Sequence, residues 1–498
     1  MEEELSCCVC LGKYILPNIL NSGITVCGFC VRKIQFCPLT RIKVEYKFLN
    51  NFVEKFFRHP RPWRRPRRLQ QFEMKKLQKS MDKIAYMNRC GMIKLIDPRD
   101  LINCDDKFIL NIDEFKLFAS KCVDLNRANK YDGKRLIHYA CAANALEIVK
   151  CLILHGVNVN CADKNNEYPI HYACTINALE IVKCLTIHGA NINCANKLGK
   201  YPIYSACWIG NEALELVKYL IINGANAKCV NGTGTHPIHY ACDRGDESLE
   251  VVKYLVANDA DVNCVDICGY GPIHIACERG DNALELVKYL ISKGANVDCV
   301  DGCGERPIHV ACESGDDALE LVKFLISKGA NVNCADNSKE YPIHWACYEG
   351  DEALEIVKVL ISHGADVNRA NNNGQLPIHI ACNMGNNSLD IVKNLIEHGA
   401  DANCANGDGD YPIHIACRNS ALILIRYLVF YGVNVNCVDK HGWSPIHIIC
   451  NMAMANSENL KILKFLIRNG ADTKLKTKNG KLPSDLTGDN AFLQLLKK

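Results

Sequence analysis

The sequence predicts a mostly α-helical solenoid of about ten helix-turn-helix repeats plus caps, with a small separate module at the N-terminus. The first observation is a phrase, P-I-H-x-A-C, that recurs in steps of 33 or 35 residues. The second is that an apolar helical pattern and a polar turn follow each phrase. The third is that residues 1–57 lack this period and carry their own cysteine pattern. Self-similarity at such a period indicates stacked repeats. The marker positions are His138, His171, Tyr204, His239, His274, His309, His344, His379, His414 and His447.

Each repeat is predicted to hold two short helices and a turn, as residues 272–306 illustrate. Pro272 can open the first helix, because the first helical N–H has no partner anyway. Gly280 is expected to end that helix after about two turns. The second helix follows in A-L-E-L-V-K-Y-L-I-S-K-G, where apolar residues recur at helical spacing and Gly294 is the stop.

Two asparagines precede second helices at a capping-box spacing, Asn144 before Glu147 and Asn177 before Glu180. This spacing predicts that the asparagine side chains cap those helices. A single helix pair cannot bury its apolar face alone, so each repeat needs a similar neighbour on both sides.

The repeated phrases resemble the ankyrin repeat. P-I-H-x-A-C stands where that family has T-P-L-H-x-A-A, and L-E-I-V-K-x-L-I-x-x-G-A-x-V-N matches its second helix and exit loop. The resemblance implies repeats over residues 130–482, a C-terminal capping repeat over 483–498, and protein–protein interaction as the function. It also implies that the motif histidine bonds the backbone of neighbouring turns. The family threonine before the proline is replaced, so its hydroxyl cap is expected to be missing: Tyr168, Tyr201, His236, Gly271, Arg306, Tyr341, Leu376, Tyr411 and Ser444.

Composition gives few signs of an unusual environment. The chain has 498 residues, of which 48% are hydrophobic, and a formal net charge of +3. That charge predicts neither a nucleic-acid nor a membrane partner. No run of 18 apolar residues predicts a spanning helix, and M-E-E-E-L-S-C-C-V-C lacks the apolar core of a secretory signal. We therefore expect a cytoplasmic protein.

Most of the 31 cysteines follow the repeats. Equivalent positions in stacked helices should lie roughly 8–10 Å apart, which is too far for a disulfide. Cysteine packs well as a small apolar group, so we interpret these residues as fillers in a reducing compartment rather than as metal or disulfide ladders. Ten close the phrase: Cys141, Cys174, Cys207, Cys242, Cys277, Cys312, Cys347, Cys382, Cys417 and Cys450. Eight lie in exit loops: Cys161, Cys194, Cys229, Cys264, Cys299, Cys334, Cys404 and Cys437.

The N-terminal cysteines form two C-x-x-C pairs, Cys7 with Cys10 and Cys27 with Cys30. Four thiolates at this spacing can close a tetrahedral structural zinc site. Zinc binding can supply the folding energy that so short a segment lacks. The alternative is that they are further filler cysteines.

The wider pattern, over residues 1–57, resembles a RING finger, with a departure toward the related U-box. In that family the first and third ligand pairs share one zinc, which implies the ligands Cys7, Cys10, Cys27 and Cys30. The second site falls on Ser22, Ile24, Cys37 and Thr40, of which only Cys37 is a credible ligand. We therefore expect one structural zinc ion.

The RING-finger resemblance implies docking of a ubiquitin-conjugating enzyme and non-covalent positioning of its ubiquitin thioester. The family's docking positions correspond here to Val9, Pro38 and Arg41. Val9 and Pro38 could instead shape the zinc knuckle, and Arg41 could be a solvated arginine. Two hypotheses follow: a ubiquitin-protein ligase whose repeats select the substrate, or a non-enzymatic scaffold with a vestigial zinc knuckle.

Residues 58–68, R-H-P-R-P-W-R-R-P-R-R, separate the two modules. Three prolines disfavour a helix, and six arginines repel one another, which indicates an extended linker. A nuclear-import signal is the second interpretation, and an arm on nucleic-acid phosphates is the third. Residues 69–129 are predicted to hold an amphipathic helix and a degenerate capping repeat.

The partner-binding residues of a repeat stack are expected among those that vary within a constant frame. The ends of the middle first helices are acidic, which favours a basic partner, although solvated loops are often acidic as well. Exposed tryptophans are typical interface anchors. The candidates are Trp208, Asp243, Glu278, Glu313, Glu349 and Trp443.

The motif histidines precede a cysteine by three residues, and such a Cys-His pair could form a nucleophile. An enzyme needs one such pair and not nine, so we assign no catalytic residue.

Overall fold

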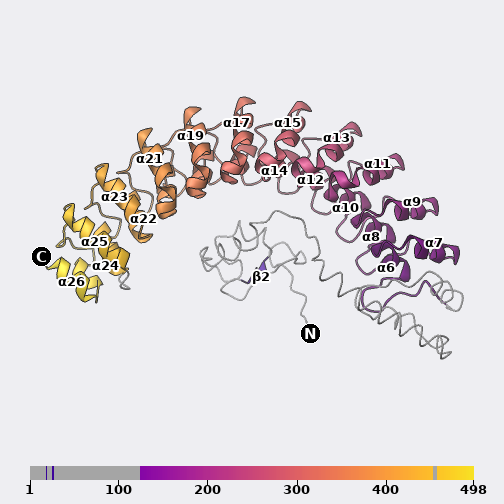
Figure 1. Ribbon diagram of the computed structural model, residues 1–498, viewed down its shortest axis with the longest axis horizontal. Helices are drawn as coiled ribbons and strands as arrows, with labels where there is room; N and C mark the ends of the chain where they lie inside the picture. Colours follow the sequence, from indigo (N-terminus) through magenta and orange to yellow (C-terminus); the bar gives the residue numbers. More distant parts are fainter. Residues whose placement is uncertain (1–17, 20–24, 27–123, 453–456, 498) are drawn as a thin grey trace. The chain divides into compact units, whose positions relative to one another are not determined.

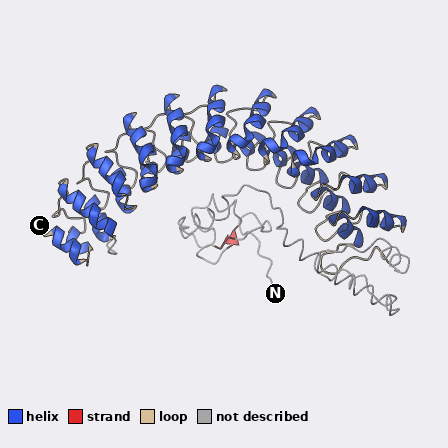
Figure 2. Ribbon diagram, in the orientation of Figure 1, coloured by secondary structure: helices blue, strands red, loops and turns tan. Residues whose placement is uncertain are grey.

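The computed structural model describes residues 18–19, 25–26, 124–452 and 457–497. The chain divides into two compact units, Met1–Gln78 and Lys79–Lys498. In the first unit, β1 (Asn18–Ile19) and β2 (Thr25–Val26) form an antiparallel pair, with Asn18 opposite Val26. Figure 2 shows strand β2 in red and the helices of the second unit in blue.

The second unit is a stack of helix pairs, in which first helices form one layer and second helices the other (Figure 1). The first helices are α6 (Leu136–Ala142), α8 (Pro169–Thr175), α10 (Pro202–Ile209), α12 (Pro237–Cys242), α14 (Pro272–Cys277), α16 (Pro307–Cys312), α18 (Pro342–Tyr348), α20 (Pro377–Asn383), α22 (Pro412–Arg418) and α24 (Pro445–Asn451). The second helices are α7 (Leu146–Leu154), α9 (Leu179–Ile187), α11 (Leu214–Ile222), α13 (Leu249–Ala257), α15 (Leu284–Ser292), α17 (Leu319–Ser327), α19 (Leu354–Ser362), α21 (Leu389–Glu397), α23 (Leu422–Phe430) and α25 (Ser457–Arg468). This confirms the predicted solenoid.

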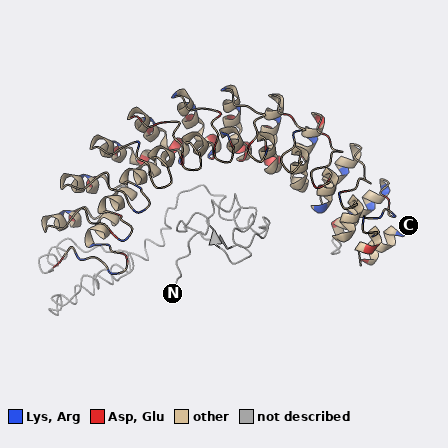
Figure 3. Cartoon of the chain, turned by 180° about the vertical axis from the view of Figure 1, so that it is seen from behind, with Lys and Arg blue, Asp and Glu red and all other residues tan. Residues whose placement is uncertain are grey.

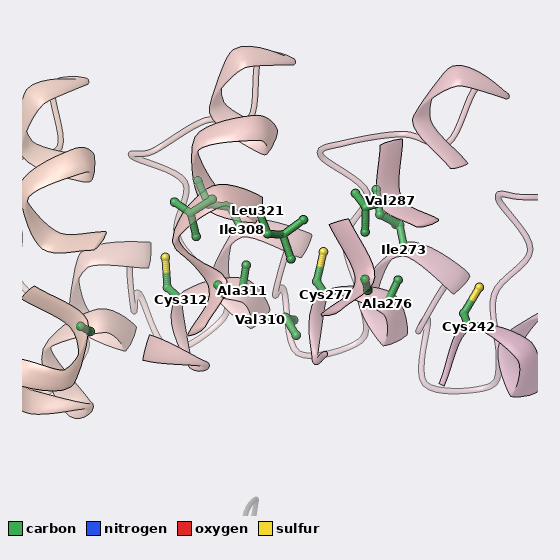
Figure 4. Packing of buried hydrophobic residues seen from close by; sticks show 14 of the residues in the cluster. Cys242, Ile273, Ala276, Cys277, Val287, Ile308, Val310, Ala311, Cys312 and Leu321 are labelled. Atoms are coloured by element: carbon green, nitrogen blue, oxygen red, sulfur yellow. The ribbon is translucent and has the colours of Figure 1, made fainter. Parts of the chain in front are cut away.

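The core runs along the stack between the two layers. In a typical repeat, Ile273 and Cys277 of α14 and Val287 of α15 are fully buried (Figure 4). The sulfur atoms of successive repeats fill the same place, as Cys242, Cys277 and Cys312 show in Figure 4. All the described cysteines are free, and those that close the repeated phrase are buried. The ten cysteines that close the phrase therefore pack as small buried side chains, as the sequence predicted.

Two kinds of turn join the paired helices, and they correspond to the two repeat lengths. In the 35-residue repeats the joint is a 3-10 turn; in the 33-residue repeats it is one residue with positive φ, namely Asn144 (57°), Asn177 (58°) and Ser420 (52°). The 3-10 turns are η2 (Asn211–Ala213), η3 (Gly245–Ser248), η4 (Gly280–Ala283), η5 (Gly315–Ala318), η6 (Gly350–Ala353) and η7 (Gly385–Ser388).

These turns correct two local predictions. Helix α14 ends at Cys277, and Gly280 opens the next turn instead of ending the helix. Asn144 and Asn177 make no side-chain cap on α7 and α9, whose N-cap residues are Ala145 and Ala178. The asparagines are needed because asparagine tolerates the left-handed conformation better than most residues.

The C-terminal repeat is shorter than the others. It consists of η8 (Pro483–Leu486) and α26 (Asn490–Leu496), and Phe492 is buried against the stack. The Asp489 carboxylate caps α26 by accepting the N–H of Ala491 at 2.7 Å. No helix among the described residues is long and apolar enough to cross a membrane.

Candidate functional site

The motif histidines connect each repeat to the next turn. Nδ1 of His309 accepts the N–H of Arg306 at 2.9 Å, and Nε2 lies 3.2 Å from the Cys334 carbonyl oxygen. Burial lowers the pKa of His309 to about 4, so the ring is neutral and Nε2–H donates to that carbonyl. In the one repeat without the histidine, the Tyr204 hydroxyl lies 2.8 Å from the carbonyl oxygens of Cys229 and Thr235. These contacts confirm the role that the family resemblance implied.

The histidines also lie near cysteines, but the pairs are not activated. Sγ of Cys334 lies 3.7 Å from Nε2 of His309, and the cysteine belongs to the exit loop rather than to the repeated phrase. Burial raises the pKa of Cys334 to about 11 and lowers that of His309. A thiolate–imidazolium pair needs the opposite shifts. The hydroxyl cap before the helix-opening proline was expected to be missing in every repeat. Ser444 differs from this expectation, because its hydroxyl lies 2.7 Å from Nδ1 of His447.

Four of the predicted partner-binding residues share one structural position. Trp208, Asp243, Glu278 and Glu313 each lie six residues after the proline that opens a first helix, in four consecutive repeats. Asp243, Glu278 and Glu313 directly follow the last residues of α12, α14 and α16, and Trp208 lies in the last turn of α10. Trp208 is 47% exposed, and Glu278 and Glu313 are exposed. We call these four residues the helix-end row.

The acidic members of the helix-end row affect one another electrostatically. The Tyr270 hydroxyl donates to Oε1 of Glu278 at 2.9 Å, and Asp243 forms an ion pair with Arg279. Desolvation raises the pKa of Glu278; the Tyr270 hydrogen bond and the Arg279 charge oppose this shift, and the like charges of Asp243 and Glu313 add to it. Figure 3 shows acidic residues along the layer of first helices in the middle of the stack. The row can therefore accept positive charge.

The other two predicted partner-binding residues lie elsewhere. Glu349 is half-buried and one position later in its repeat, directly after α18. Trp443 is half-buried in a turn, where its ring packs against His447 at 6.4 Å between centroids. The structure therefore groups four of the six predicted residues and leaves these two apart.

A buried polar cluster that the sequence did not predict lies near α18. Oε1 of Glu340 accepts hydrogen bonds from Nδ2 of Asn371 at 2.7 Å and from the Tyr348 hydroxyl at 3.3 Å. Burial raises the pKa of Glu340 to about 7. Oε2 of Glu340 and Nε1 of Trp345 are buried without a hydrogen-bond partner. Trp345 is thus half-buried and packs against Tyr348, which makes it a poor surface anchor.

Several aspartates in the turns between the paired helices have a structural role. Oδ1 of Asp281 accepts the N–H of Leu321 at 2.7 Å, which caps the second helix of the following repeat. Asp246, Asp316 and Asp351 make equivalent contacts, and so does Asn211 with Val251. A carboxylate at a helix N-terminus satisfies free N–H groups and the helix dipole. The signal in the sequence is a G-D or G-N pair at the turn between the two helices, a position where only the 35-residue repeats carry it.

Metal ligation is not indicated among the described side chains of the stack. Ligand atoms of Asp301, Cys303 and Glu305 lie within 4.8 Å of one another. The turn accounts for this proximity, because Oδ1 of Asp301 accepts the N–H groups of Cys303 and Glu305 at 2.8 Å each. The proposed zinc and enzyme-docking residues lie outside the described part of the chain: Cys7, Val9, Cys10, Cys27, Cys30, Pro38 and Arg41.

The fold and its surface define a repeat-stack protein that binds other proteins through residues displayed on a constant frame. Comparison gives the family: ankyrin repeats (3 copies) match residues 110–196, 203–301, 246–336, 273–371, 308–406 and 378–477. The chain belongs to the ankyrin-repeat family. Among solved structures it is similar to the ankyrin repeat domain of Bcl-3, described as a unique member of the IkappaB protein family. The identity is 24% and the TM-score 0.40, and the match covers 46% of this chain and 99% of that one. No curated protein matches.

Proposed function

We propose that the helix-end row binds a basic segment of a partner protein. The single observation that carries this proposal is that Trp208, Asp243, Glu278 and Glu313 occupy one position in four consecutive repeats. Trp208 supplies an exposed aromatic anchor beside the acidic groups. A cationic partner would be attracted by the carboxylates of Asp243, Glu278 and Glu313, which carry like charge along the row.

The binding test compares two triple variants with the same charge change. In the first, Asp243→Asn, Glu278→Gln and Glu313→Gln remove the acidic groups of the row. In the control, Glu285→Gln, Glu320→Gln and Glu355→Gln remove exposed carboxylates on second helices, each in an ion pair with a lysine three residues later. For a lysine-rich peptide with a central tryptophan, titrated at low salt, we expect about tenfold weaker binding to the row variant. Equal effects of both variants would contradict the row as the binding site.

We further propose that residues 1–57 form a zinc-bound RING-like module that makes the protein a ubiquitin-protein ligase, with the repeats as the substrate-selecting part. The spacing of Cys7, Cys10, Cys27 and Cys30 supports this proposal. The antiparallel pair of β1 and β2 also supports it, because it reverses the chain between the two cysteine pairs. A non-enzymatic scaffold with a vestigial zinc knuckle is the competing function, favoured by the missing second ligand set.

The ligase proposal has two direct tests. We expect one zinc ion per chain by atomic absorption, and loss of that zinc in Cys27→Ala. We also expect autoubiquitination in a purified system with a panel of conjugating enzymes, abolished by Cys27→Ala and retained in the row variant. Zinc without conjugation would favour the scaffold, and zero or two zinc ions would contradict the assigned ligands.

A further inference from the structure

Some first helices carry an aromatic side chain three residues after their first residue, and a lysine of the preceding repeat covers two of these rings. Nζ of Lys134 lies 5.0 Å from the ring centroid of Tyr172, and Nζ of Lys200 lies 4.8 Å from that of Tyr240. Both lysines lie two residues before the first helix of their own repeat begins. The frame thus brings this residue of one repeat over a ring of the next.

Trp345 is a further ring at this position, and the residue in the place of the lysine is Glu305. The spacing between Glu305 and Trp345 equals the spacing between Lys200 and Tyr240. Among the described residues, the lysine and arginine groups that lie over rings cover other side chains, and none covers Trp345. The other repeats that follow a described repeat have no ring at this position: Ser205, Ile275, Val310, Ile380, Ile415 and Ile448.

A second carboxylate lies close to the same ring. Trp345 packs against Tyr348, with 6.2 Å between the ring centroids, and the Tyr348 hydroxyl donates to Oε1 of Glu340 at 3.3 Å. Oε2 of Glu340 is buried without a hydrogen-bond partner in the described stack, and the charge of Asp336, which also acts on this carboxyl group, is negative as well. A cation close to Glu340 would therefore be stabilised by a buried negative charge.

We propose that Trp345, Tyr348, Glu305 and Glu340, which we call the Trp345 site, bind a lysine side chain of a partner protein. A cation is attracted both by the face of an aromatic ring and by the two carboxylates. The cation is a lysine because the chain itself places a lysine over both equivalent rings. Tyr348 lies six residues after its helix-opening proline, which is the position of the helix-end row in the next repeat. The inference therefore rests on the proposed function, since the same basic segment supplies the lysine.

The test uses variants that copy residues which the frame already carries at the same positions. Glu305→Lys copies Lys200 and fills the Trp345 site from within the chain. Trp345→Ile removes the ring and copies the isoleucine of other repeats. The matched control is Glu167→Lys, which makes the same charge change at the equivalent position, where the next repeat carries Ser205 instead of a ring.

The first measurement follows the indole N–H resonance of Trp345 by NMR in full-length protein with isotope-labelled tryptophan, and Trp345→Ile assigns this resonance by its loss. The probe is n-butylammonium, the lysine side chain, added at constant ionic strength and at pH 8, because burial raises the pKa of Glu340 to about 7. We expect a saturable shift in the wild type and in Glu167→Lys, and about fivefold weaker affinity in Glu305→Lys. Neutral 1-butanol should give no saturable shift. An absent shift in the wild type, an equal shift with 1-butanol, or unchanged affinity in Glu305→Lys would overturn the proposal.

The second measurement identifies the source of the ammonium group with the lysine-rich peptide that tests the helix-end row. We expect about threefold weaker peptide binding to Glu305→Lys and to Trp345→Ile, and unchanged binding to Glu167→Lys. Unchanged binding to the first two variants would refute a partner's lysine as the occupant. Concentration-dependent self-association that Glu305→Lys abolishes would also refute a separate partner, because a second copy would then supply the lysine.

The helix-end row and the Trp345 site fail separately in these measurements. The triple variant of the row should leave the n-butylammonium shift of Trp345 unchanged. An absent n-butylammonium shift, together with weaker peptide binding to the row variant, would refute the Trp345 site alone. A saturable n-butylammonium shift, together with unchanged peptide binding to the row variant, would refute the row alone.

Discussion

Repeats of 33 residues and repeats of 35 residues share one frame but join their two helices differently. Both kinds keep the buried cysteine, the helix-opening proline except at Leu136, and the histidine that bonds to the next turn except at Tyr204. The 33-residue repeats reverse direction on a single residue such as Asn177, with φ 58°. The 35-residue repeats insert a 3-10 turn that begins at a glycine or, in η2, directly after Gly210. Two added residues thus leave the core unchanged and alter the contact with the neighbouring repeat.

The added turn creates a clasp between repeats that the shorter ones lack. Its second residue, for example Asp281, caps a helix 39–40 residues further on. Its first residue, Gly280, lies so close to the next turn that an added Cβ would be 2.6 Å from the Asp317 carbonyl oxygen. In the 33-residue repeat, Asn177 instead donates one hydrogen bond to the Glu212 carbonyl. The middle of the stack therefore has a contact between successive turns that its first repeats lack.

Acidification tests the buried motif histidines, which both repeat lengths share. We expect the largest loss of stability from their protonation. Burial lowers the pKa of His309 from 6.5 in the unfolded chain to about 4, so the folded state binds fewer protons between these values. The free energy of unfolding is therefore unaffected by His309 above pH 6.5 and decreases as the pH drops toward 4. A pKa difference of one unit corresponds to about 1.4 kcal/mol, so protonation of His309 alone should lower the free energy of unfolding by about 3 kcal/mol over this pH range.

The measurement is the urea midpoint of unfolding from pH 7.5 to 4.5. His309→Tyr, which copies the natural Tyr204, should make the midpoint less sensitive to pH, and Tyr204→His should make it more sensitive. A midpoint that stays constant between pH 7 and 5 would contradict neutral buried histidines.

The second test breaks the contact that only neighbouring 35-residue repeats make. In Gly280→Ala the new methyl group meets the Asp317 carbonyl, and the residue must also keep φ +57°, so we expect a loss of about 2–4 kcal/mol. Gly385→Ala is the matched control. Its φ is +67°, but its neighbour is a 33-residue repeat and a Cβ meets only side-chain atoms at 3.6 Å or more. We expect about 1 kcal/mol there, from backbone strain alone.

Calorimetric unfolding of both variants provides the comparison. Equal losses at Gly280 and Gly385 would mean that backbone strain, and not the contact between long repeats, decides the cost.

The sequence predicted the local features of this fold and, apart from the histidine contacts that the family resemblance implied, missed the non-local ones. Pro272 and Gly294 affect only the adjacent backbone, so the start of α14 and the end of α15 were predicted correctly. The Asn144 spacing was misread, because an asparagine three residues before a glutamate suits both a capping box and a left-handed turn. The role of Asp281 was missed, since its partner lies 40 residues away.

The third test concerns the cap itself, and its effect should be the smallest. Asp281→Ala leaves the N–H of Leu321 without its acceptor, so we expect a loss of about 1 kcal/mol. Asp281→Asn should be nearly neutral, because Asn211 makes the same contact at 3.0 and 3.2 Å in the first 35-residue repeat. Amide hydrogen exchange at Leu321 should accelerate in Asp281→Ala, whereas exchange at Val182 in a 33-residue repeat should not change. If both amides accelerated equally, the clasp would stabilise the whole stack, and the difference between the two repeat lengths would lie in geometry alone.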